Sequence, residues 1–510
     1  MRGHIMKNKL QQLFVLTLIT VILIFIFYLY VPYFIYLTVI TELFSLIVCI
    51  SLIFFDERNT TSKFSWILAI LMFPYLGIIS FILIGRNPKS RKFSIQQTQN
   101  ELAIQKYVKK LIRSQNYVQH LNNTLPSEIF KLSGKSPVVG NQIDVFHDGN
   151  KAFTEILKDI QSASHHIHVF YFIIKGDSTG EKLLKLLAEK AKQGVIVRLM
   201  YDSVGSIKLP YDLIRYMKES GVETRVYDLV NSPLLSTRVN WRNHRKMIVI
   251  DGKIAHVGGM NIGDEYLSKT KEFNYWRDTN IRMMGLSVIE VQEIFLYDWF
   301  FLNTDIKAET FLKQSEYYFP TTEKKLSGET IQVIYGGPYD SERIIKDAII
   351  NIIGKARRSI KIAMPYFVPD EDSLAVLRRA ARCGIKIQLI IPGKGDRGIS
   401  FHGTNSFIDR LLDVGIEVFF YNPNSFIHCK VIIVDDEIAT IGSTNFDIRS
   451  FHLNHELSVF IYGPSETVNK LNQQFERDLE CSISVYNYQQ KKSTLTIINE
   501  KLSKLFIPLL

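Results

Sequence analysis

Two stretches of the chain carry the same polar residues at the same spacing. They are NHRKMIVIDGKIAHVGGMN at 243–261 and FIHCKVIIVDDEIATIGSTN at 426–445. The residues able to do chemistry are, in order, His244, Lys246 and Asp251 in the first copy and His428, Lys430 and Asp435 in the second. One imidazole that attacks phosphorus, a second that protonates the leaving group, and lysines that bind an anion together suit phosphodiester chemistry. The duplication therefore predicts one site to which each copy contributes one His.

The spacing within each copy predicts how the side chains are displayed. Residues two apart on a strand share a face, so His and Lys point one way while Arg245 and Cys429 point the other. We interpret Cys429 as a packing residue because free cysteine is commonly buried. Asp251 and Asp435 complete the catalytic set, but they follow an apolar run and precede a turn, where Asp binds backbone. We therefore expect them to support the site without contacting the substrate.

A returning strand in each copy brings small residues and an amide beside the His-x-Lys segment. Gly258-Gly259 and Gly442-Ser443 allow a ligand to approach the backbone, and Asn261 and Asn445 are candidate substrate-binding donors. Losing one such donor typically costs about 3 kcal/mol of transition-state stabilisation. Neither a carboxylate cluster nor zinc-ligand spacing accompanies the motif. We therefore expect no cofactor, with the lysines neutralising charge as Mg²⁺ does elsewhere.

The elements that must position these residues also occur twice. Strand, amphipathic helix and strand patterns follow one another at 165–202 and again at 358–393, and each series closes on one copy of the motif. This pattern predicts a duplicated α/β domain with two mixed sheets flanked by helices. We place the first half at 140–325 and the second at 326–510, after a helical linker at 93–139.

Residues 1–92 are predicted to form a transmembrane region. Three apolar segments, at 13–30, 33–55 and 64–84, approach the length of about 20 residues that crosses a bilayer. The segments at 33–55 and 64–84 flank the short turn DERNTTSK and are the stronger pair. The pattern predicts a multi-pass protein of the cell membrane.

The distribution of basic residues conflicts with three full crossings. Basic residues follow the last segment at 86–92, which places the remainder of the chain in the cytoplasm by the positive-inside rule. Arg2, Lys7 and Lys9 favour the same side, and three crossings put the two ends on opposite sides. Either the N-terminus is forced outside or one segment does not cross fully.

Charge and cysteine content narrow the partners. The formal net charge of +11 allows either nucleic acid or an anionic lipid surface as a partner, and the apolar segments favour lipid over nucleic acid. The four cysteines have no paired spacing, which argues against a disulfide framework and suits a reducing compartment. Oligomeric state is left open.

The pattern H-x-K-x(4)-D-x(6)-G-[GS]-x-N, present twice, is the signature of the phospholipase D superfamily. With the N-terminal segments and FPYLGIISFILIGRN at 73–87, the chain from about residue 34 resembles the bacterial cardiolipin synthases of that superfamily. The extra apolar segment at 13–30 departs from the two-span pattern of that family.

The resemblance implies both roles and a reaction. His244 would be the nucleophile and His428 the general acid, with Asp278 of YWRD and Glu456 of LNHE each orienting the His of the other half. The reaction would transfer a phosphatidyl group between two phosphatidylglycerol molecules in the bilayer, giving cardiolipin and glycerol through a phosphohistidine.

Two other interpretations are kept beside this one. A hydrolytic phospholipase D or a membrane-tethered nuclease would keep the chemistry and change the substrate. A non-catalytic lipid-binding scaffold would need neither His, and two intact motifs speak against it. The cluster His165, His166 and His168 is interpreted as structural, because no acids of matching spacing accompany it.

Overall fold

A computed structural model describes most of the chain. The described residues are 21, 31–56, 60–85, 94–114, 124–227, 241–320, 328–340, 342–396, 398–487 and 493–506. They belong to two compact units, one at Met1–Asn87 and one from Pro88 to the C-terminal region. The first boundary lies close to the predicted end of the membrane region at 92.

From residue 31 onward, the described part of the N-terminal unit forms α2 (Val31–Phe55), α3 (Thr60–Met72) and α4 (Pro74–Ile84). Among the described residues, Ile35–Phe55 within α2 is the one stretch long and apolar enough to cross a membrane. The predicted segment at 13–30 lies outside the described residues except for Val21. The basic residues at 2–9 and 86–92 also lie outside the described residues.

The prediction of one continuous span at 64–84 is wrong. The chain leaves the helical conformation at Phe73, whose φ is −136° and ψ 71°, and α4 begins at Pro74. Proline has no backbone N–H to give, and its ring disfavours the helical conformation in the residue before it. Because the segment is apolar throughout, its composition predicted one continuous span where the structure has two helices.

The first half of the catalytic unit, the second compact unit, contains a mixed sheet of seven strands. Its strands are β1 (Val138–Asp148), β2 (His166–Tyr171), β3 (Ile196–Asp202), β4 (Glu223–Tyr227), β6 (Lys246–Ile250), β7 (Ile254–Gly258) and β8 (Tyr275–Met284). The order across the sheet is β4-β3-β2-β6-β7-β8-β1. The β4-β3-β2 strands are parallel, and the remaining pairs are antiparallel.

The second half repeats this order. Its strands are β9 (Glu329–Gly336), β10 (Ser359–Ala363), β12 (Lys386–Pro392), β13 (Glu417–Tyr421), β15 (Val431–Val434), β16 (Ile438–Gly442) and β18 (Asn454–Tyr462). They are ordered β13-β12-β10-β15-β16-β18-β9, with β19 (Ser482–Ser484) added beside β13. Because β1 pairs with both β8 and β9, the two sheets are joined. The predicted duplicated α/β architecture is confirmed.

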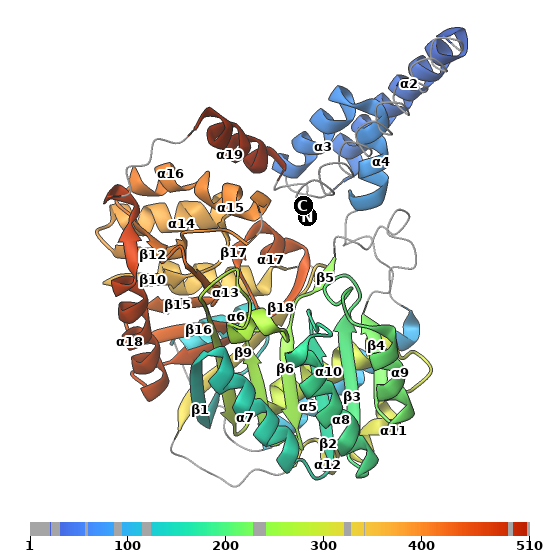
Figure 1. Cartoon of the computed structure of the whole chain (residues 1–510), viewed down its shortest axis with the longest axis vertical. Helices are drawn as coiled ribbons and strands as arrows, with labels where there is room; N and C mark the ends of the chain where they lie inside the picture. Colours follow the sequence, from blue (N-terminus) through green and yellow to red (C-terminus); the bar gives the residue numbers. More distant parts are fainter. Residues whose placement is uncertain are drawn as a thin grey trace, which may run out of the picture. The chain divides into compact units, whose positions relative to one another are not determined.

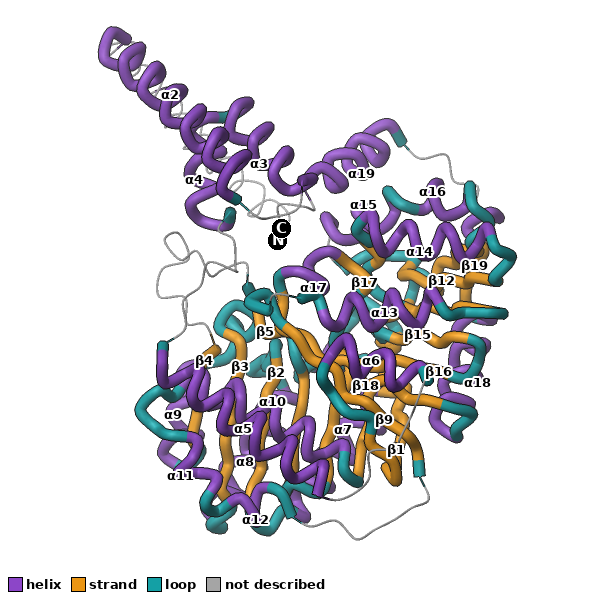
Figure 2. The backbone as a smooth tube through the Cα atoms, turned by 180° about the vertical axis from the view of Figure 1, so that it is seen from behind, coloured by secondary structure: helices purple, strands orange, loops and turns teal. Residues whose placement is uncertain are grey.

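Helices cover the outer face of each sheet (Figures 1 and 2). The first sheet carries α7 (Gly149–Ser162), α8 (Ser178–Lys192) and α9 (Tyr211–Glu219). The second carries α13 (Ile344–Gly354), α14 (Glu371–Arg382) and α16 (Ile408–Leu412). Each layer has its own buried apolar cluster.

A third cluster joins the halves. It combines inward residues of both sheets with α10 (Ser287–Leu302), α18 (Glu466–Glu480) and α5 (Ile95–Ser114). Burying one continuous apolar core at about 25 cal/mol per Å² favours a fixed geometry between the halves, which a shared site requires.

The remaining elements are short or peripheral. They are α6 (Leu125–Ser133), α11 (Ala308–Leu312), α12 (Ser315–Tyr318), α15 (Gly398–Asn405), α17 (Ile448–His452), α19 (Thr494–Phe506), β5 (Arg242–Asn243), β11 (Phe367–Val368), β14 (Ser425–Ile427) and β17 (Phe446–Asp447). Two of them, β5 and β14, end directly before His244 and His428 and so position these residues.

Candidate active site

Each His predicted to be catalytic lies in a short link between two strands, and the strand before each link pairs with the other half. β5 pairs in parallel with β18, and β14 pairs in parallel with β8. The backbone N–H of His244 donates to the carbonyl of His455 at 2.9 Å, and that of His428 donates to Arg277 at 2.7 Å. The prediction that His and Lys share one strand is therefore wrong. β6 begins at Lys246 and β15 at Val431, because the preceding residues pair across to the other half.

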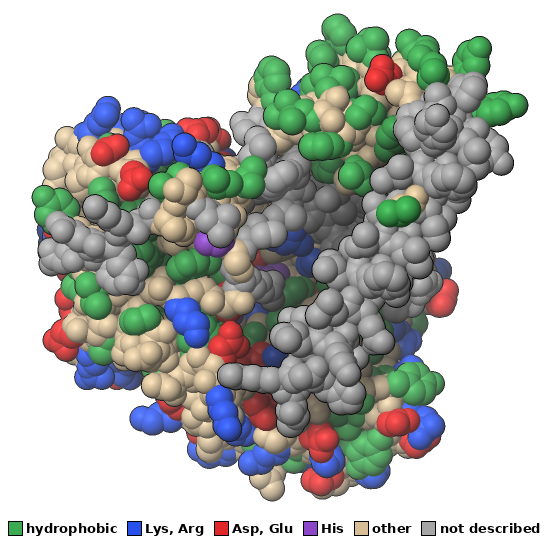
Figure 3. Space-filling model, turned by 45° about the horizontal axis from the view of Figure 1, so that its top comes forward, with side chains coloured by type: hydrophobic (Ala, Val, Ile, Leu, Met, Phe, Trp, Pro, Cys, Tyr) green, Lys and Arg blue, Asp and Glu red, His purple; other side chains and the backbone are tan. Residues whose placement is uncertain are grey.

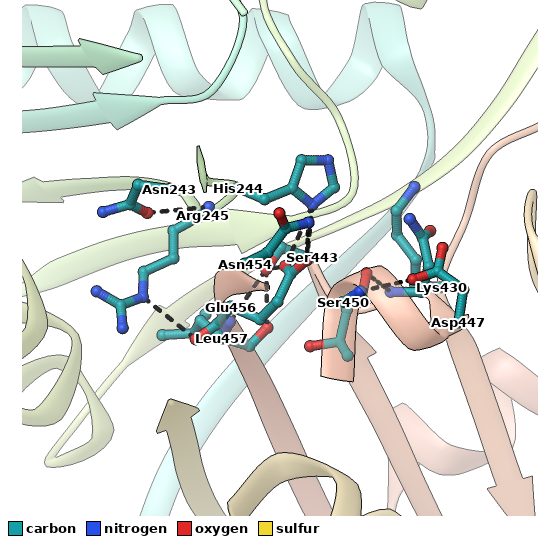
Figure 4. Close-up of polar contacts among 12 residues, drawn as sticks. Asn243, His244, Arg245, Lys430, Ser443, Asp447, Ser450, Asn454, Glu456 and Leu457 are labelled. Atoms are coloured by element: carbon teal, nitrogen blue, oxygen red, sulfur yellow. Dashed lines mark hydrogen bonds and ion pairs between the residues drawn. The ribbon is translucent and has the colours of Figure 1, made fainter. Parts of the chain in front are cut away.

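This exchange of backbone pairs brings each imidazole to a carboxylate of the opposite half. His244 Nδ1 lies 3.0 and 3.2 Å from the two carboxylate oxygens of Glu456. His428 Nδ1 lies 2.7 Å from an oxygen of Asp278. An Nδ1–H donated to a carboxylate fixes the tautomer and leaves Nε2 as the reactive atom. Figure 4 shows His244 with Glu456, Ser443 and Asn454 around it.

The two lysine side chains donate to the backbone carbonyls of the two histidines. Lys246 Nζ donates to the carbonyl of His244 at 2.5 Å, and Lys430 Nζ donates to the carbonyl of His428. Lys430 Nζ also lies 3.2 Å from His428 Nε2. Burial lowers the pKa of Lys430, and Glu456 of the first dyad is among the charges that raise it. The two motifs therefore form one electrostatically coupled site.

Burial dominates the ionisation of both histidines. It lowers the pKa of His244 to about 4, with Glu456 opposing the shift and Lys246 and Lys430 adding to it. It lowers the pKa of His428 to about 4, with Lys430 adding and Asp278 opposing. Both imidazoles are neutral at pH 7 in the free protein. A neutral imidazole is the nucleophilic form, and an anionic phosphate between the two favours protonation of the other.

The carboxylates that hold the histidines stay ionised. Burial raises the pKa of Glu456, but His244, Lys246 and the Ser443 hydroxyl together bring it below its ordinary value. For Asp278 the same cost of burial is outweighed by His428, Lys430 and the backbone N–H of Thr279. Each dyad is thus a neutral His that donates to a buried carboxylate.

Asp251 and Asp435 lie at the far ends of β6 and β15 from the histidines. Asp251 accepts the backbone N–H groups of Ser164, His165 and His166 at 2.8 Å each. Asp435 accepts those of Arg357, Arg358 and Ser359 at 2.7–2.9 Å. Both Asp residues have positive φ, 51° and 56°, a conformation that Asp tolerates in turns. Their carboxylates fix the start of the neighbouring strand, so we assign them a structural role.

The two predicted substrate-binding amides differ. Asn261 Oδ1 accepts the backbone N–H of Ile173 at 3.2 Å, and its Nδ2 donates to the Tyr266 hydroxyl at 2.8 Å. Both polar ends of Asn261 are therefore used within the fold. Asn445 is also buried, but its Oδ1 has no hydrogen-bond partner among the described residues. Asn445 is the better candidate for a substrate contact.

Several contacts of the dyads were not predicted from the motif. Asn454 donates to Glu456 at 3.2 Å, and Ser443 Oγ donates to the same carboxylate at 2.5 Å. Aromatic rings flank the imidazoles, with Phe172 4.8 Å from His244 and Trp276 5.4 Å from His428 between ring centroids. Trp276 and Asn454 are each two residues before a dyad carboxylate, which is the sequence signal that could have found them.

Arg245 and Cys429, the residues between His and Lys in the two motifs, face away from the site, as predicted. Arg245 is buried and bound to both oxygens of Asp298 at 2.8 and 2.7 Å, while Cys429 is fully buried. Burial raises the pKa of the Cys429 thiol to about 12, so this residue is not a nucleophile. Arg245 lines a separate cavity of about 360 Å³ together with Glu290, Glu293 and Asp340, behind the strand that carries the site.

The histidine cluster on β2 is packed into the core. His166 and His168 are fully buried, and His168 stacks on Phe295 at 4.3 Å and contacts Gln292. Within the described parts of the chain, no group of His, Cys, Asp and Glu has the arrangement of a metal site. The structural interpretation of this cluster agrees with these contacts.

The family models match both units of the chain. The model described as "Cardiolipin synthase, PLD-like domain" matches residues 156–299 and 349–479. The model described as "Phospholipase_D-nuclease N-terminal" matches residues 43–86, which include α3 and α4.

Curated relatives match over nearly the whole length. A cardiolipin synthase of Alkalihalophilus pseudofirmus is 37% identical over 465 residues, covering 90% of this chain and 91% of the relative. One of Geobacillus thermodenitrificans is 37% identical, covering 92% and 94%. Cardiolipin synthase 1 of Bacillus cereus is 34% identical, covering 90% and 91%.

A solved structure shares the fold. The phosphatidylserine synthase of Haemophilus influenzae superposes with a TM-score of 0.57, covering 75% of this chain and 97% of that one, at 14% identity. At that identity the likeness concerns the fold alone.

Proposed function

The chain belongs to the cardiolipin synthase family of phospholipase D-like proteins, and from this we propose that it transfers a phosphatidyl group between two phosphatidylglycerol molecules. The observation that carries the proposal is the crossed pair of dyads, His244 with Glu456 and His428 with Asp278. A site assembled from both halves supplies two imidazoles to one phosphodiester.

The first step cleaves the donor lipid. Nε2 of His244 attacks phosphorus and forms a P–N bond while the P–O bond to glycerol breaks. His428, protonated on binding the anionic donor, gives its proton to the departing alkoxide, and glycerol leaves. Lys246, Lys430 and Asn445 are suited to neutralise the oxygens on which charge builds up. Glu456 stabilises the cation that forms on the His244 ring.

The second step transfers the group. His428, now neutral, takes the proton from a hydroxyl of the second phosphatidylglycerol, whose oxygen attacks the phosphohistidine. The P–N bond breaks, cardiolipin forms, and His244 returns to its starting state. Protons balance over the cycle because His428 regains the proton that it gave away.

We assign the nucleophile to His244 on two observations. Its side chain is 13% exposed against 8% for His428, so it is the more accessible of the two. Its carboxylate partner is held by Ser443 and Asn454 as well, which stabilises a negative charge beside the positively charged phosphohistidine.

The N-terminal unit supports the proposed lipid substrate and the proposed location in the membrane. α2 is long and apolar enough to cross a membrane, and basic residues at 86–92 follow the unit in the sequence. We therefore place the protein in the cell membrane, with the catalytic unit on the cytoplasmic side. Basic residues near the surface attract anionic lipid, at about 1 kcal/mol each, and phosphatidylglycerol is anionic.

The test is a product assay with labelled phosphatidylglycerol in vesicles. Cardiolipin with glycerol supports the proposal, phosphatidic acid with glycerol indicates a hydrolase, and cleavage of nucleic acid alone indicates a nuclease. Absence of turnover for every substrate would indicate a scaffold. His244→Ala and His428→Ala are each expected to lose turnover by about 10⁴-fold or more, because catalytic groups that act as a unit fail together.

A donor with an activated leaving group separates the two histidines. Such a donor needs no general acid, so His428→Ala should still form a trapped phospho-enzyme while His244→Ala should not. Trapping in His244→Ala instead would reverse the assignment of roles.

A further inference from the structure

The N-terminal unit contains a feature that apolar composition does not reveal. α3 and α4 are not two parts of one bent span, because their side chains meet far from the turn. The rings of Trp66 on α3 and Phe81 on α4 have centroids 5.3 Å apart. A continuous helix would separate these residues by about 22 Å along its axis. The chain therefore reverses at Phe73–Pro74 and forms a helical hairpin.

Close backbone packing holds this hairpin together. A Cβ added to Gly77 would lie 2.6 Å from the carbonyl oxygen of Ala69 and 2.6 Å from the Cα of Ile70. Small residues that let two helix backbones approach are typical of packing between helices in membranes. Trp66, Ile70 and Ile78 form a buried cluster with Leu52 and Cys49 of α2, so α2 packs against the hairpin.

Contacts with α2 give the direction and depth of the hairpin. Lys63, near the start of α3, donates to the carbonyl of Ile53 near the end of α2 at 3.5 Å. Tyr75, at the tip of the hairpin, shares a hydrogen bond of 3.0 Å with Thr38 near the start of α2. Ile53 and Thr38 are about 22 Å apart along α2. The tip thus reaches most of the way along α2 before the chain returns.

Neither arm of the hairpin is long enough to cross a bilayer. α3 has 13 residues and α4 has 11, which correspond to about 20 and 16 Å. The hydrocarbon core is about 30 Å thick. The large apolar side chains of this unit are nevertheless exposed, as Figure 3 shows for the surface over its helices. They include Leu43 and Ile47 on α2, Leu68 on α3, and Leu76 and Ile79 on α4.

We propose that α2 crosses the membrane once and that α3–α4 is a re-entrant hairpin, which enters and leaves the lipid on the side of Phe55. Residues 56–63 and the basic residues at 86–92 then lie on one side, which the positive-inside rule identifies as the cytoplasm. The start of α2 lies outside.

The test compares the sides of single cysteines in the full-length protein. The background is Cys49→Ala, Cys383→Ser and Cys481→Ser, with the fully buried Cys429 retained. Ser62→Cys and Ser94→Cys are expected to react with a membrane-impermeant maleimide only in opened cells, and Tyr33→Cys is expected to react in intact cells. Two full spans would instead place Ser62 opposite Ser94, and labelling of these two from opposite sides overturns the proposal.

A cross-link tests the hairpin without reference to sides. In the same background, Trp66→Cys with Phe81→Cys should be joined by a short bifunctional maleimide, seen as a bridged peptide by mass spectrometry. The two single variants are the matched controls for cross-links between molecules. A straight span keeps these positions too far apart for the reagent, so a double variant that inserts into the membrane and is not bridged contradicts the hairpin. The inference does not depend on the proposed reaction, because both readouts are independent of turnover.

Discussion

His244 and His428 occupy equivalent positions in the two halves, but the carboxylates that hold them are supported differently. Glu456 uses both oxygens for His244 and also accepts Ser443 and Asn454. Asp278 approaches His428 at 2.7 Å, and its other oxygen accepts the backbone N–H of Thr279. One position of the duplicated motif accounts for part of this difference, since Ser443 in the second half corresponds to Gly259 in the first.

The difference shows how a duplicated fold supports two unlike roles. Sheet order, strand register and the turns at Asp251 and Asp435 are the same in both halves, so the scaffold is symmetric. The polar residues that contact the two dyads, however, differ between the halves. The proposed nucleophile and the proposed general acid would need different electrostatic surroundings, and the polar residues around the two dyads differ accordingly.

Among the variants that compare the two halves, the carboxylates should give the largest effect. Glu456→Gln and Asp278→Asn keep the shape but remove the charge that fixes the tautomer, and each should lower turnover by about 10² to 10⁴-fold. We expect the greater loss in Asp278→Asn, because Asp278 contacts His428 Nδ1 at 2.7 Å, closer than the 3.0 and 3.2 Å at which Glu456 contacts His244. Steady-state rates with labelled phosphatidylglycerol measure this, and a larger loss in Glu456→Gln would contradict the difference drawn between the dyads.

Gly259 and Ser443 occupy the same position of the two motifs, and exchanging them should lower activity by different amounts in the two halves. A side chain at Gly259 would place its Cβ 2.3 Å from Asp278 Oδ1 and 3.1 Å from Lys430 Cδ, so Gly259→Ser must displace the dyad. We expect a loss of about 100-fold. Ser443→Gly removes one hydrogen bond to Glu456 and should cost about tenfold, corresponding to about 1.4 kcal/mol. Equal losses in the two variants would show that the halves are interchangeable at this position. Circular dichroism controls for folding.

The two amides should separate stability from activity. Asn261→Ala removes the side-chain acceptor of the buried Ile173 N–H and a hydrogen bond to the Tyr266 hydroxyl, which should lower the free energy of unfolding by about 1–3 kcal/mol. Asn445→Ala should leave stability nearly unchanged and lower kcat by about tenfold, since its Oδ1 has no partner in the described chain. Thermal melts and rates on the same preparations decide this. The reverse pattern would assign the substrate contact to Asn261.

The smallest effect concerns acid sensitivity at one core position that differs between the halves. Burial lowers the pKa of His166 to about 3, whereas the equivalent residue of the second half is Ser359. The unfolded chain binds a proton at this His below about pH 6.5, and the folded chain does not. Stability is therefore complete above pH 6.5 and is lost as the pH falls toward 3.

Between pH 6.5 and 5 this single group should account for roughly 2 kcal/mol. His166→Gln should accordingly flatten the dependence of the melting temperature on pH over this range, while Ser359→Ala serves as the matched control in the second half. An unchanged slope in His166→Gln would locate the acid sensitivity elsewhere.

Much of the site followed from short-range patterns. The two His-x-Lys pairs, the opposite orientation of Arg245 and Cys429, and the turn role of Asp251 and Asp435 depend on strand parity and on residues adjacent in sequence. Glu456 and Asp278 were assigned by resemblance, since nothing in their local sequence links either of them to a His more than 100 positions away.

Other features depended on contacts that no local pattern carries. The apolar segment at 64–84 has the composition of a span, and only tertiary contacts, such as Trp66 with Phe81 and Gly77 with Ala69 and Ile70, distinguish a hairpin from a helix. The His-x-Lys segments read as strands, but β5 and β14 pair with the opposite half, so each His lies just before the strand predicted to hold it.

The sequence by itself determined the repeated α/β pattern, the pair of catalytic motifs and the apolar N-terminal region, because periodicity and spacing record which faces are buried and which residues recur together. Only the tertiary structure decided which carboxylate each His binds, which of the two Asn residues is used within the fold, and where the apolar chain turns back. These outcomes depend on distances between residues far apart in the chain, and such distances are set by how the two sheets and the N-terminal helices pack.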